Sequence, residues 1–178
     1  MHPNMLQVLR QPAFGHAVDM RGVGPCRDKR ESSHERSHGG LRERGAAMLI
    51  AGTPRRTIWV GENGRSVWII DQTRLPHELE LVELFDLEAA AVAIESMQVR
   101  GAPLIGATAA YGVAIALRDD ASDEAFDRTI AYLAKQRPTA INLRWALDEM
   151  RTALRPAPAS ERTAIAWRRA AEIADEDV

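Results

Sequence analysis

The sequence predicts an α+β domain in which a small antiparallel sheet is followed by a bundle of helices. Three observations lead to this fold class. The first 47 residues show no sustained hydrophobic period, residues 56–84 are rich in β-branched and aromatic residues around a turn, and residues 86–178 repeat apolar side chains at helical spacing. A run of strands followed by a run of helices is typical of α+β layouts.

Residues 1–47 are expected to be a disordered leader, or the product of an upstream start that precedes a natural start at Met48. The polar stretch between Cys26 and Arg44 has almost no large apolar side chains, so it cannot bury enough surface to offset the entropy lost on ordering. The leader also carries the basic excess, with eight Lys and Arg against five Asp and Glu. Residues 48–178 are therefore expected to form the folded domain.

The expected sheet begins with Thr57–Val60 and Ser66–Ile70, which flank a turn containing Asn63-Gly64. Asn-Gly between two such runs is a strong hairpin signal, because both residues tolerate the positive φ of tight turns. A third strand is expected at Glu78–Leu84, where leucines at 79 and 81 alternate with glutamates.

Five helices are expected after the sheet. Asp86 can cap the first, and its shared apolar face comprises Leu87, Ala90, Ala91, Ile94 and Met97. The second, Ala102–Leu117, is apolar nearly all round, as expected of a helix packed on several sides. Ser122 can cap the third, which Arg137-Pro138 ends.

The fourth helix is expected to begin at Thr139 or Ala140, because Leu143, Ala146, Leu147 and Met150 recur at helical spacing. The fifth is weaker in pattern, follows two prolines, and is capped by Ser160.

Composition argues against several classes of partner. The net charge of −2 gives no basic field for nucleic acid. The apolar run Ala102–Leu117 is short for a membrane span and contains two glycines. The single cysteine, Cys26, excludes an intrachain disulfide framework and a CxxC zinc site, and it fits a reducing compartment. We expect no nucleic-acid partner, no membrane partner and a cytoplasmic location.

Two helix starts carry an arginine directly ahead of them. Arg100 and Gly101 precede a start with Pro103 in its first turn, and Arg137 precedes the fourth helix. Free N–H groups and the helix dipole favour an anion there, and a guanidinium adds a planar donor fork suited to phosphate. From spacing alone, two other interpretations stay open: an ordinary helix start with a surface arginine, and a loop arginine followed by a Thr139 cap.

Three segments occur in order and at a characteristic spacing: Ile70–Glu78 (IDQTRLPHE), Val99–Gly112 (VRGAPLIGATAAYG) and Arg137–Leu147 (RPTAINLRWAL). Together they resemble the amino-terminal half of the methylthioribose-1-phosphate isomerase family, over about residues 48–178. The resemblance implies an aldose–ketose isomerase of methionine salvage, which converts 5-methylthioribose 1-phosphate to 5-methylthioribulose 1-phosphate. It also implies a homodimer at full length, with a sugar phosphate as substrate and no metal or organic cofactor.

The resemblance also implies roles for particular residues. Arg100, Gly101, Ala102 and Arg137 match the family's substrate-binding positions. The family's catalytic cysteine and aspartate belong to a larger Rossmann-like domain that follows, so both are expected beyond Val178 and none in this chain. Cys26 cannot replace that cysteine, because it lies in the unmatched leader. Residues 48–178 are thus expected to be a substrate-binding domain cut off before the catalytic one, and inactive alone.

Four alternatives remain at this level. A ribose-1,5-bisphosphate isomerase looks similar but recognises a second phosphate. The regulatory subunits of the exchange factor for translation initiation share the fold and bind partners or sugar phosphates, and the chain itself could be a non-catalytic binding or dimerisation module. Within the domain, Asp71 and His77 could form an acid/base pair, although a proline-containing turn is the favoured interpretation.

Overall fold

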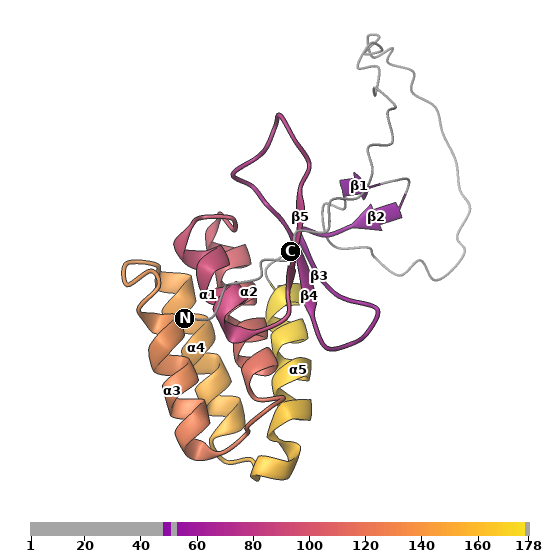
Figure 1. Ribbon diagram of the computed structural model, residues 1–178. Coiled ribbons are helices and arrows are strands. Elements are labelled where there is room, and N and C mark those ends of the chain that lie inside the picture. Colours follow the sequence, from indigo (N-terminus) through magenta and orange to yellow (C-terminus); the bar gives the residue numbers. More distant parts are fainter. Residues whose placement is uncertain (1–47, 51–52, 177–178) are drawn as a thin grey trace, which may run out of the picture. The chain divides into compact units, whose positions relative to one another are not determined.

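The computed structural model describes residues 48–50 and 53–176, in which five short strands precede five helices (Figure 1). The expected leader therefore lies outside the described residues. The strands are β1 (Met48–Ile50), β2 (Thr53–Arg55), β3 (Ile58–Val60), β4 (Val67–Ile70) and β5 (Leu81–Leu84). The helices are α1 (Leu87–Glu95), α2 (Ala102–Ala116), α3 (Asp123–Ala134), α4 (Ile141–Leu154) and α5 (Ala159–Glu176). The predicted α+β class is confirmed.

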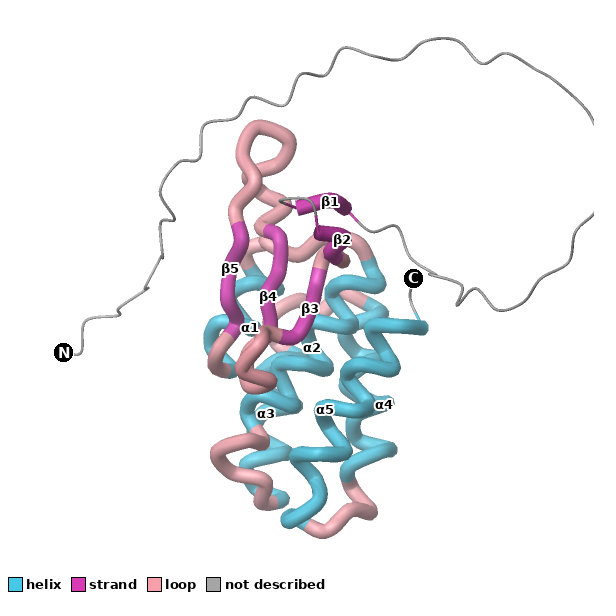
Figure 2. The backbone as a smooth tube through the Cα atoms, turned by 90° about the vertical axis from the view of Figure 1, so that its right-hand side faces the viewer, coloured by secondary structure: helices cyan, strands magenta, loops and turns pink. Residues whose placement is uncertain are grey.

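The main sheet is antiparallel in the order β3-β4-β5, as Figure 2 shows, and β4 is its central strand. The predicted hairpin joins β3 to β4 with Val60 opposite Val67. Its turn is held by Asn63, whose side-chain oxygen accepts hydrogen bonds from the backbone N–H groups of Arg65 and Ser66. Gly64 has φ 63°, the left-handed conformation that glycine adopts at no steric cost.

The third strand differs from the prediction in length and in the face that it buries. β5 starts only at Leu81, and its pairing with β4 sets Leu84 opposite Val67. Leu84 is fully buried, whereas Leu79 and Leu81 are 47% and 38% exposed. Because side chains alternate along a strand, burying Leu84 turns Leu81 outward. The antiparallel hairpin of β1 and β2 was not predicted.

Helix α2 is the centre of the bundle. It packs against each of the other four helices, and every residue from Leu104 to Ile115 is buried. This confirms the prediction of a helix covered on several sides. Among the described residues, no helix is both long enough and apolar enough to cross a membrane.

The capping residues predicted for α1 and α3 are confirmed, and the one predicted for α5 is wrong. Asp86 caps α1 and Ser122 caps α3, each through a bond to a backbone N–H. Met97 does not share the face of α1, because the helix ends at Glu95 and Met97 has φ 62°. Ser160 caps nothing, since the Pro158 carbonyl already accepts from Arg162 N–H and α5 begins at Ala159.

α5 is not a weak helix, because it is the longest of the described helices and a buried arginine anchors its first turns. Arg162 is only 4% exposed and lies over the ring of Phe126. Its guanidinium donates to the carbonyls of Leu154, Ala121 and Ala157 at 3.2, 2.6 and 3.1 Å. It also pairs with the Asp123 carboxylate at 2.8 Å. One side chain thus joins the α2–α3 loop, the start of α3, the α4–α5 turn and α5.

Candidate functional site

The segment that enters α2 begins with a glycine in a conformation that other residues rarely adopt. Gly101 has φ 85° and ψ 138°, a combination that is essentially restricted to glycine. Pro103 lies in the first turn, where its missing N–H costs no hydrogen bond. Arg100 is exposed, and its own backbone N–H donates to the side-chain oxygen of Gln72 at 2.9 Å.

The segment that enters α4 is a turn closed by its own backbone. The N–H of Ala140 donates to the Arg137 carbonyl at 3.0 Å, and Ala140 then serves as the N-cap residue of α4. The guanidinium of Arg144 reaches back to the Pro138 carbonyl. Arg137 itself is half-buried, and within the described part of the chain its side chain has no hydrogen bond or ion pair. Thr139 is not the cap.

The starts of α2 and α4 lie side by side. A Cβ built on Gly106 would lie 3.3 Å from the Asn142 carbonyl oxygen and 3.5 Å from the Ala146 Cβ. Glycine at this position therefore lets the early turns of the two helices approach closely. The two arginine-bearing helix starts thus open at the same end of the bundle.

The starts of α2 and α4 differ from those of α1 and α3 in whether a side chain caps their free N–H groups. α1 and α3 have a side-chain cap from Asp86 and Ser122. The N-cap residues of α2 and α4 are Gly101 and Ala140, and neither provides a side-chain cap. The first N–H groups of α2 and α4 therefore remain available to a bound anion, which the helix dipoles would favour.

Gln72 connects the motif segment Ile70–Glu78 to this end of the bundle, and it was not among the residues predicted to form the site. Besides accepting from Arg100, it donates its backbone N–H to the Gln98 carbonyl at 2.9 Å. The only local signal for it was its position in the segment Ile70–Glu78. All three segments that carry the family resemblance therefore meet at the starts of α2 and α4.

Asp71 and His77 do not form an acid/base pair. Asp71 is 4% exposed, and its carboxylate accepts from the backbone N–H and the hydroxyl of Thr73 at 2.8 and 2.6 Å. His77 is exposed at the far end of the same turn. A carboxylate that closes its own turn in this way is structural. The interpretation of this segment as a turn is confirmed.

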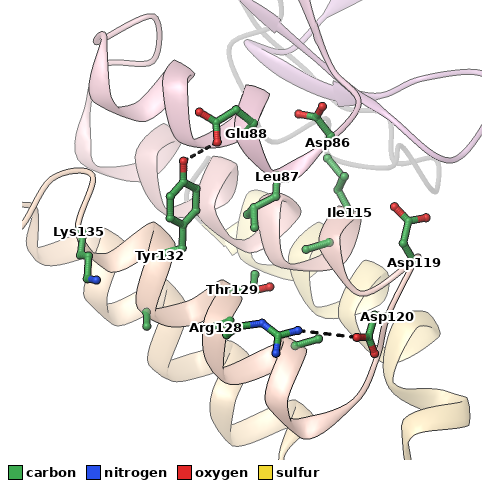
Figure 3. A pocket seen from close by; sticks show the side chains of 13 residues that line it. Asp86, Leu87, Glu88, Ile115, Asp119, Asp120, Arg128, Thr129, Tyr132 and Lys135 are labelled. Carbon is green, nitrogen blue, oxygen red and sulfur yellow. Dashed lines mark hydrogen bonds and ion pairs between the residues drawn. The ribbon is translucent and has the colours of Figure 1, made fainter. Parts of the chain in front are cut away.

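A hollow of about 800 Å³ lies elsewhere, against α1, the end of α2 and α3 (Figure 3). Its acidic side chains are Asp86, Glu88, Asp119 and Asp120, against the two bases Arg128 and Lys135. Glu88 accepts from the hydroxyl of Tyr132 at 2.5 Å, which raises the pKa of that phenol. A surface with this excess of carboxylates repels a phosphate, and none of the four expected substrate-binding residues lines it.

The described residues contain one buried tyrosine with a perturbed pKa. Tyr111 is 4% exposed and packs its ring 5.9 Å from that of Trp167. Burial raises its pKa, the nearby Asp175 raises it further, and Arg56 opposes both. Within the part of the chain that the structure describes, no cluster of three or more His, Cys, Asp or Glu is arranged to hold a metal ion.

The comparisons with known proteins agree on one family. Residues 98–178 match the model of the initiation factor 2 subunit family. The chain is 62% identical over 130 residues to a methylthioribose-1-phosphate isomerase of Paramagnetospirillum magneticum, which covers 73% of this chain and 36% of that protein. It is also 55% identical over 131 residues to an uncharacterised protein in the petC 3' region of Rhodospirillum rubrum, covering 74% of this chain and 71% of that one.

A solved structure agrees with the sequence relatives. The crystal structure of 5-methylthioribose 1-phosphate isomerase from Pyrococcus horikoshii superposes with a TM-score of 0.63 at 33% identity, over 68% of this chain and 36% of that one. The chain therefore spans little more than a third of the length of the isomerases that it matches.

Proposed function

Since this chain belongs to the methylthioribose-1-phosphate isomerase family, within the wider initiation factor 2 subunit family, we propose that it is the substrate-binding part of such an isomerase. Its ligand is 5-methylthioribose 1-phosphate, which the complete enzyme converts to 5-methylthioribulose 1-phosphate in methionine salvage. Residues 48–178 form the substrate-binding domain. Arg100, Gly101, Ala102 and Arg137 hold the ligand, and no residue of this chain carries out the hydrogen transfer.

The observation that carries the proposal is the meeting of three separate motif segments at one end of the bundle. Gln72 bonds to Arg100, and Gly106 lies against Asn142. Both helix starts there are free of side-chain caps, and each follows an arginine. Two donor forks and two sets of free N–H groups suit a dianion gripped from two sides.

The chemical contribution of this end of the bundle is orientation. The phosphate on C1 blocks easy ring opening, so the enzyme must hold the sugar while hydrogen moves between C2 and C1. Arginine and N–H donors fix the phosphate and offset its charge, which places the sugar for the acid and base groups. Those groups, a cysteine and an aspartate, belong to the catalytic domain of the full-length enzyme, which we propose is a cytoplasmic homodimer.

A titration of the 178-residue chain with 5-methylthioribose 1-phosphate, followed by backbone amide NMR, tests the proposal. The largest shifts are expected at the amides of Gly101, Ala102 and Ile141, and the same sugar without phosphate should give none. Arg137→Lys keeps the charge but cannot form two parallel bonds, so affinity should fall about ten- to a hundredfold. Arg151→Lys, an exposed arginine further along α4, is the matched control.

Equal affinity in Arg137→Lys and wild type would make Arg137 a loop residue without a role in binding. Loss of the folded state in Arg137→Lys would instead make it structural. If the titration shifts no amide at the two helix starts, the proposed site is wrong.

A second function has one observation in its favour. The matching family model is that of initiation factor 2 subunits, so the chain could be a regulatory module that binds a protein partner without chemistry. Such a module has no need of uncapped helix starts behind arginines. Phosphate-dependent amide shifts at Gly101 and Ala102 therefore favour a sugar-phosphate site over a module that binds only protein, and their absence favours the module.

A further inference from the structure

Gln72 holds the segment that enters α2 through two hydrogen bonds in opposite directions. Its side-chain oxygen accepts the backbone N–H of Arg100 at 2.9 Å, and its backbone N–H donates to the Gln98 carbonyl at 2.9 Å. The two bonds grip the chain on either side of the buried Val99. The backbone of Arg100 is thus fixed by a residue 28 positions away in the sequence.

The backbone that carries the Gln72 side chain is itself held in place by its neighbours. Asp71, directly before it, donates its backbone N–H to the Glu80 carbonyl at 2.9 Å and accepts two bonds from Thr73. Ile70, one residue earlier, is the fully buried last residue of the central strand β4. The sheet therefore determines where the Gln72 side chain lies, and through it the position of Arg100.

The bond to Arg100 bears directly on the neighbouring Gly101. Gly101 needs φ 85° to leave the first N–H groups of α2 open, and nothing lies within 4 Å of where its Cβ would be. No neighbouring group therefore occupies the space where a side chain at this position would lie. The Gln72 bond acts one residue earlier, and the Ile105 N–H bond to the Gly101 carbonyl at 3.2 Å acts one turn later.

We propose that Gln72 is a positioning residue for substrate binding: its side-chain oxygen holds the Arg100 backbone so that the Arg100 guanidinium and the free N–H groups of α2 face the same phosphate. This rests on the proposed function. The amide is needed in place of a carboxylate, because glutamate would accept the same N–H but would add a negative charge beside a bound dianion.

Three variants of the 178-residue chain separate positioning from plain structural support. Gln72→Met keeps the length and removes the acceptor, Gln72→Glu keeps the acceptor and adds charge, and Gln98→Met is the matched control. The Gln98 side chain has no hydrogen bond among the described residues, since only its backbone carbonyl is used. The probes are 5-methylthioribose 1-phosphate and inorganic phosphate, titrated at low and high salt.

Gln72→Met should weaken sugar phosphate binding about two- to tenfold at both salt concentrations, the value of one lost hydrogen bond. Gln72→Glu should weaken it about tenfold or more at low salt, with the difference shrinking as salt is added. Gln98→Met should bind like wild type. A purely structural Gln72 would make Gln72→Glu indistinguishable from wild type, and that result overturns the inference.

Hydrogen exchange at the Arg100 amide provides a readout without ligand. It should be several times faster in Gln72→Met than in wild type, and unchanged in Gln72→Glu and Gln98→Met. Unchanged exchange in Gln72→Met would refute the positioning role, whatever the ligand. If exchange changes as expected but the wild-type chain binds neither probe, the proposed function fails while the mechanical role of Gln72 stands.

Discussion

Replacing Arg162 by methionine should remove a large part of the stability of the domain. Arg162→Met keeps the apolar stem over Phe126 but removes every donor. The carbonyls of Leu154, Ala121 and Ala157 then lose their bonds from the guanidinium. Asp123 loses less, because its side chain is 65% exposed and water can solvate it.

The size of the effect follows from the buried acceptors. The Leu154 carbonyl keeps its bond from the Ala157 N–H, so only the Ala121 and Ala157 carbonyls lose their donor. A buried acceptor left without a donor costs about 1–3 kcal/mol, and the losses at one side chain are not additive, so we expect about 3–4 kcal/mol in total. Domains are typically stable by about 5–15 kcal/mol, so this is a substantial fraction. The melting temperature should fall by roughly 10–15 °C.

Urea unfolding followed by circular dichroism measures the change, and Arg168→Met on the same helix is the control. Arg168 is 68% exposed and has only a 4.0 Å contact with Glu172, so its loss should change the free energy of unfolding by less than about 0.5 kcal/mol. The Arg162 effect should persist in high salt, because most of its bonds go to neutral carbonyls. A loss below about 1 kcal/mol would refute the assignment of Arg162 as the anchor of α5.

Three further outcomes are expected. Gly112→Ala should lower the free energy of unfolding in urea by a net of about 1 kcal/mol, despite the better helix propensity of alanine. The new Cβ would lie 3.1 Å from the Ala90 Cβ and 3.3 Å from the Leu133 side chain. An unchanged or raised stability would show that the helices move apart freely. Burial raises the pKa of Tyr111, so the neutral phenol contributes its full stabilisation of the folded state below pH 10, and this contribution is lost as the pH rises through the folded-state pKa. The free energy of unfolding should therefore fall less above pH 10 in Tyr111→Phe than in wild type. An identical pH dependence of the two proteins would count against this prediction. The purified 178-residue chain should not convert 5-methylthioribose 1-phosphate above a buffer blank in a product assay, and any enzymatic turnover would place catalytic groups in this chain.

The elements that the sequence predicted well are those whose cause is local. Asn63-Gly64 makes a turn because of its own backbone preferences, and the Asn63 side chain closes that turn by accepting from Arg65 and Ser66. Asp86 and Ser122 cap helices because their acceptors reach an N–H three residues later. None of these depends on what the rest of the chain does.

The errors arose where a partner far along the chain decides the outcome. Leu79 and Leu81 alternate correctly for a strand, but the pairing of β5 with β4 determines which face is buried. Met97 continues the helical spacing of α1, yet the chain turns there to present Val99 to the core. Ser160 follows two prolines like a cap, but Pro158 already provides the accepting carbonyl.

In the candidate site, too, the features with a local cause were predictable and those set by a distant partner were not. Both helix starts were predictable from Arg-Gly and Arg-Pro, which act on their own backbone. The contact of Gly106 with Asn142 and the bond from Arg100 to Gln72 join residues far apart in the sequence, and no local pattern predicts them. Their proximity could be inferred only from the family resemblance.

The burial of α2 on all sides has a consequence during synthesis on the ribosome. α2 is translated before α3, α4 and α5, which together cover most of its surface. The last of them ends 60 residues after α2 does, an interval of about 3–12 s at common elongation rates. Throughout that interval α2, the most apolar of the described helices, lacks the last helix that buries it. Slow codons within α3 or α4 would prolong this exposure and should lower the yield of folded protein.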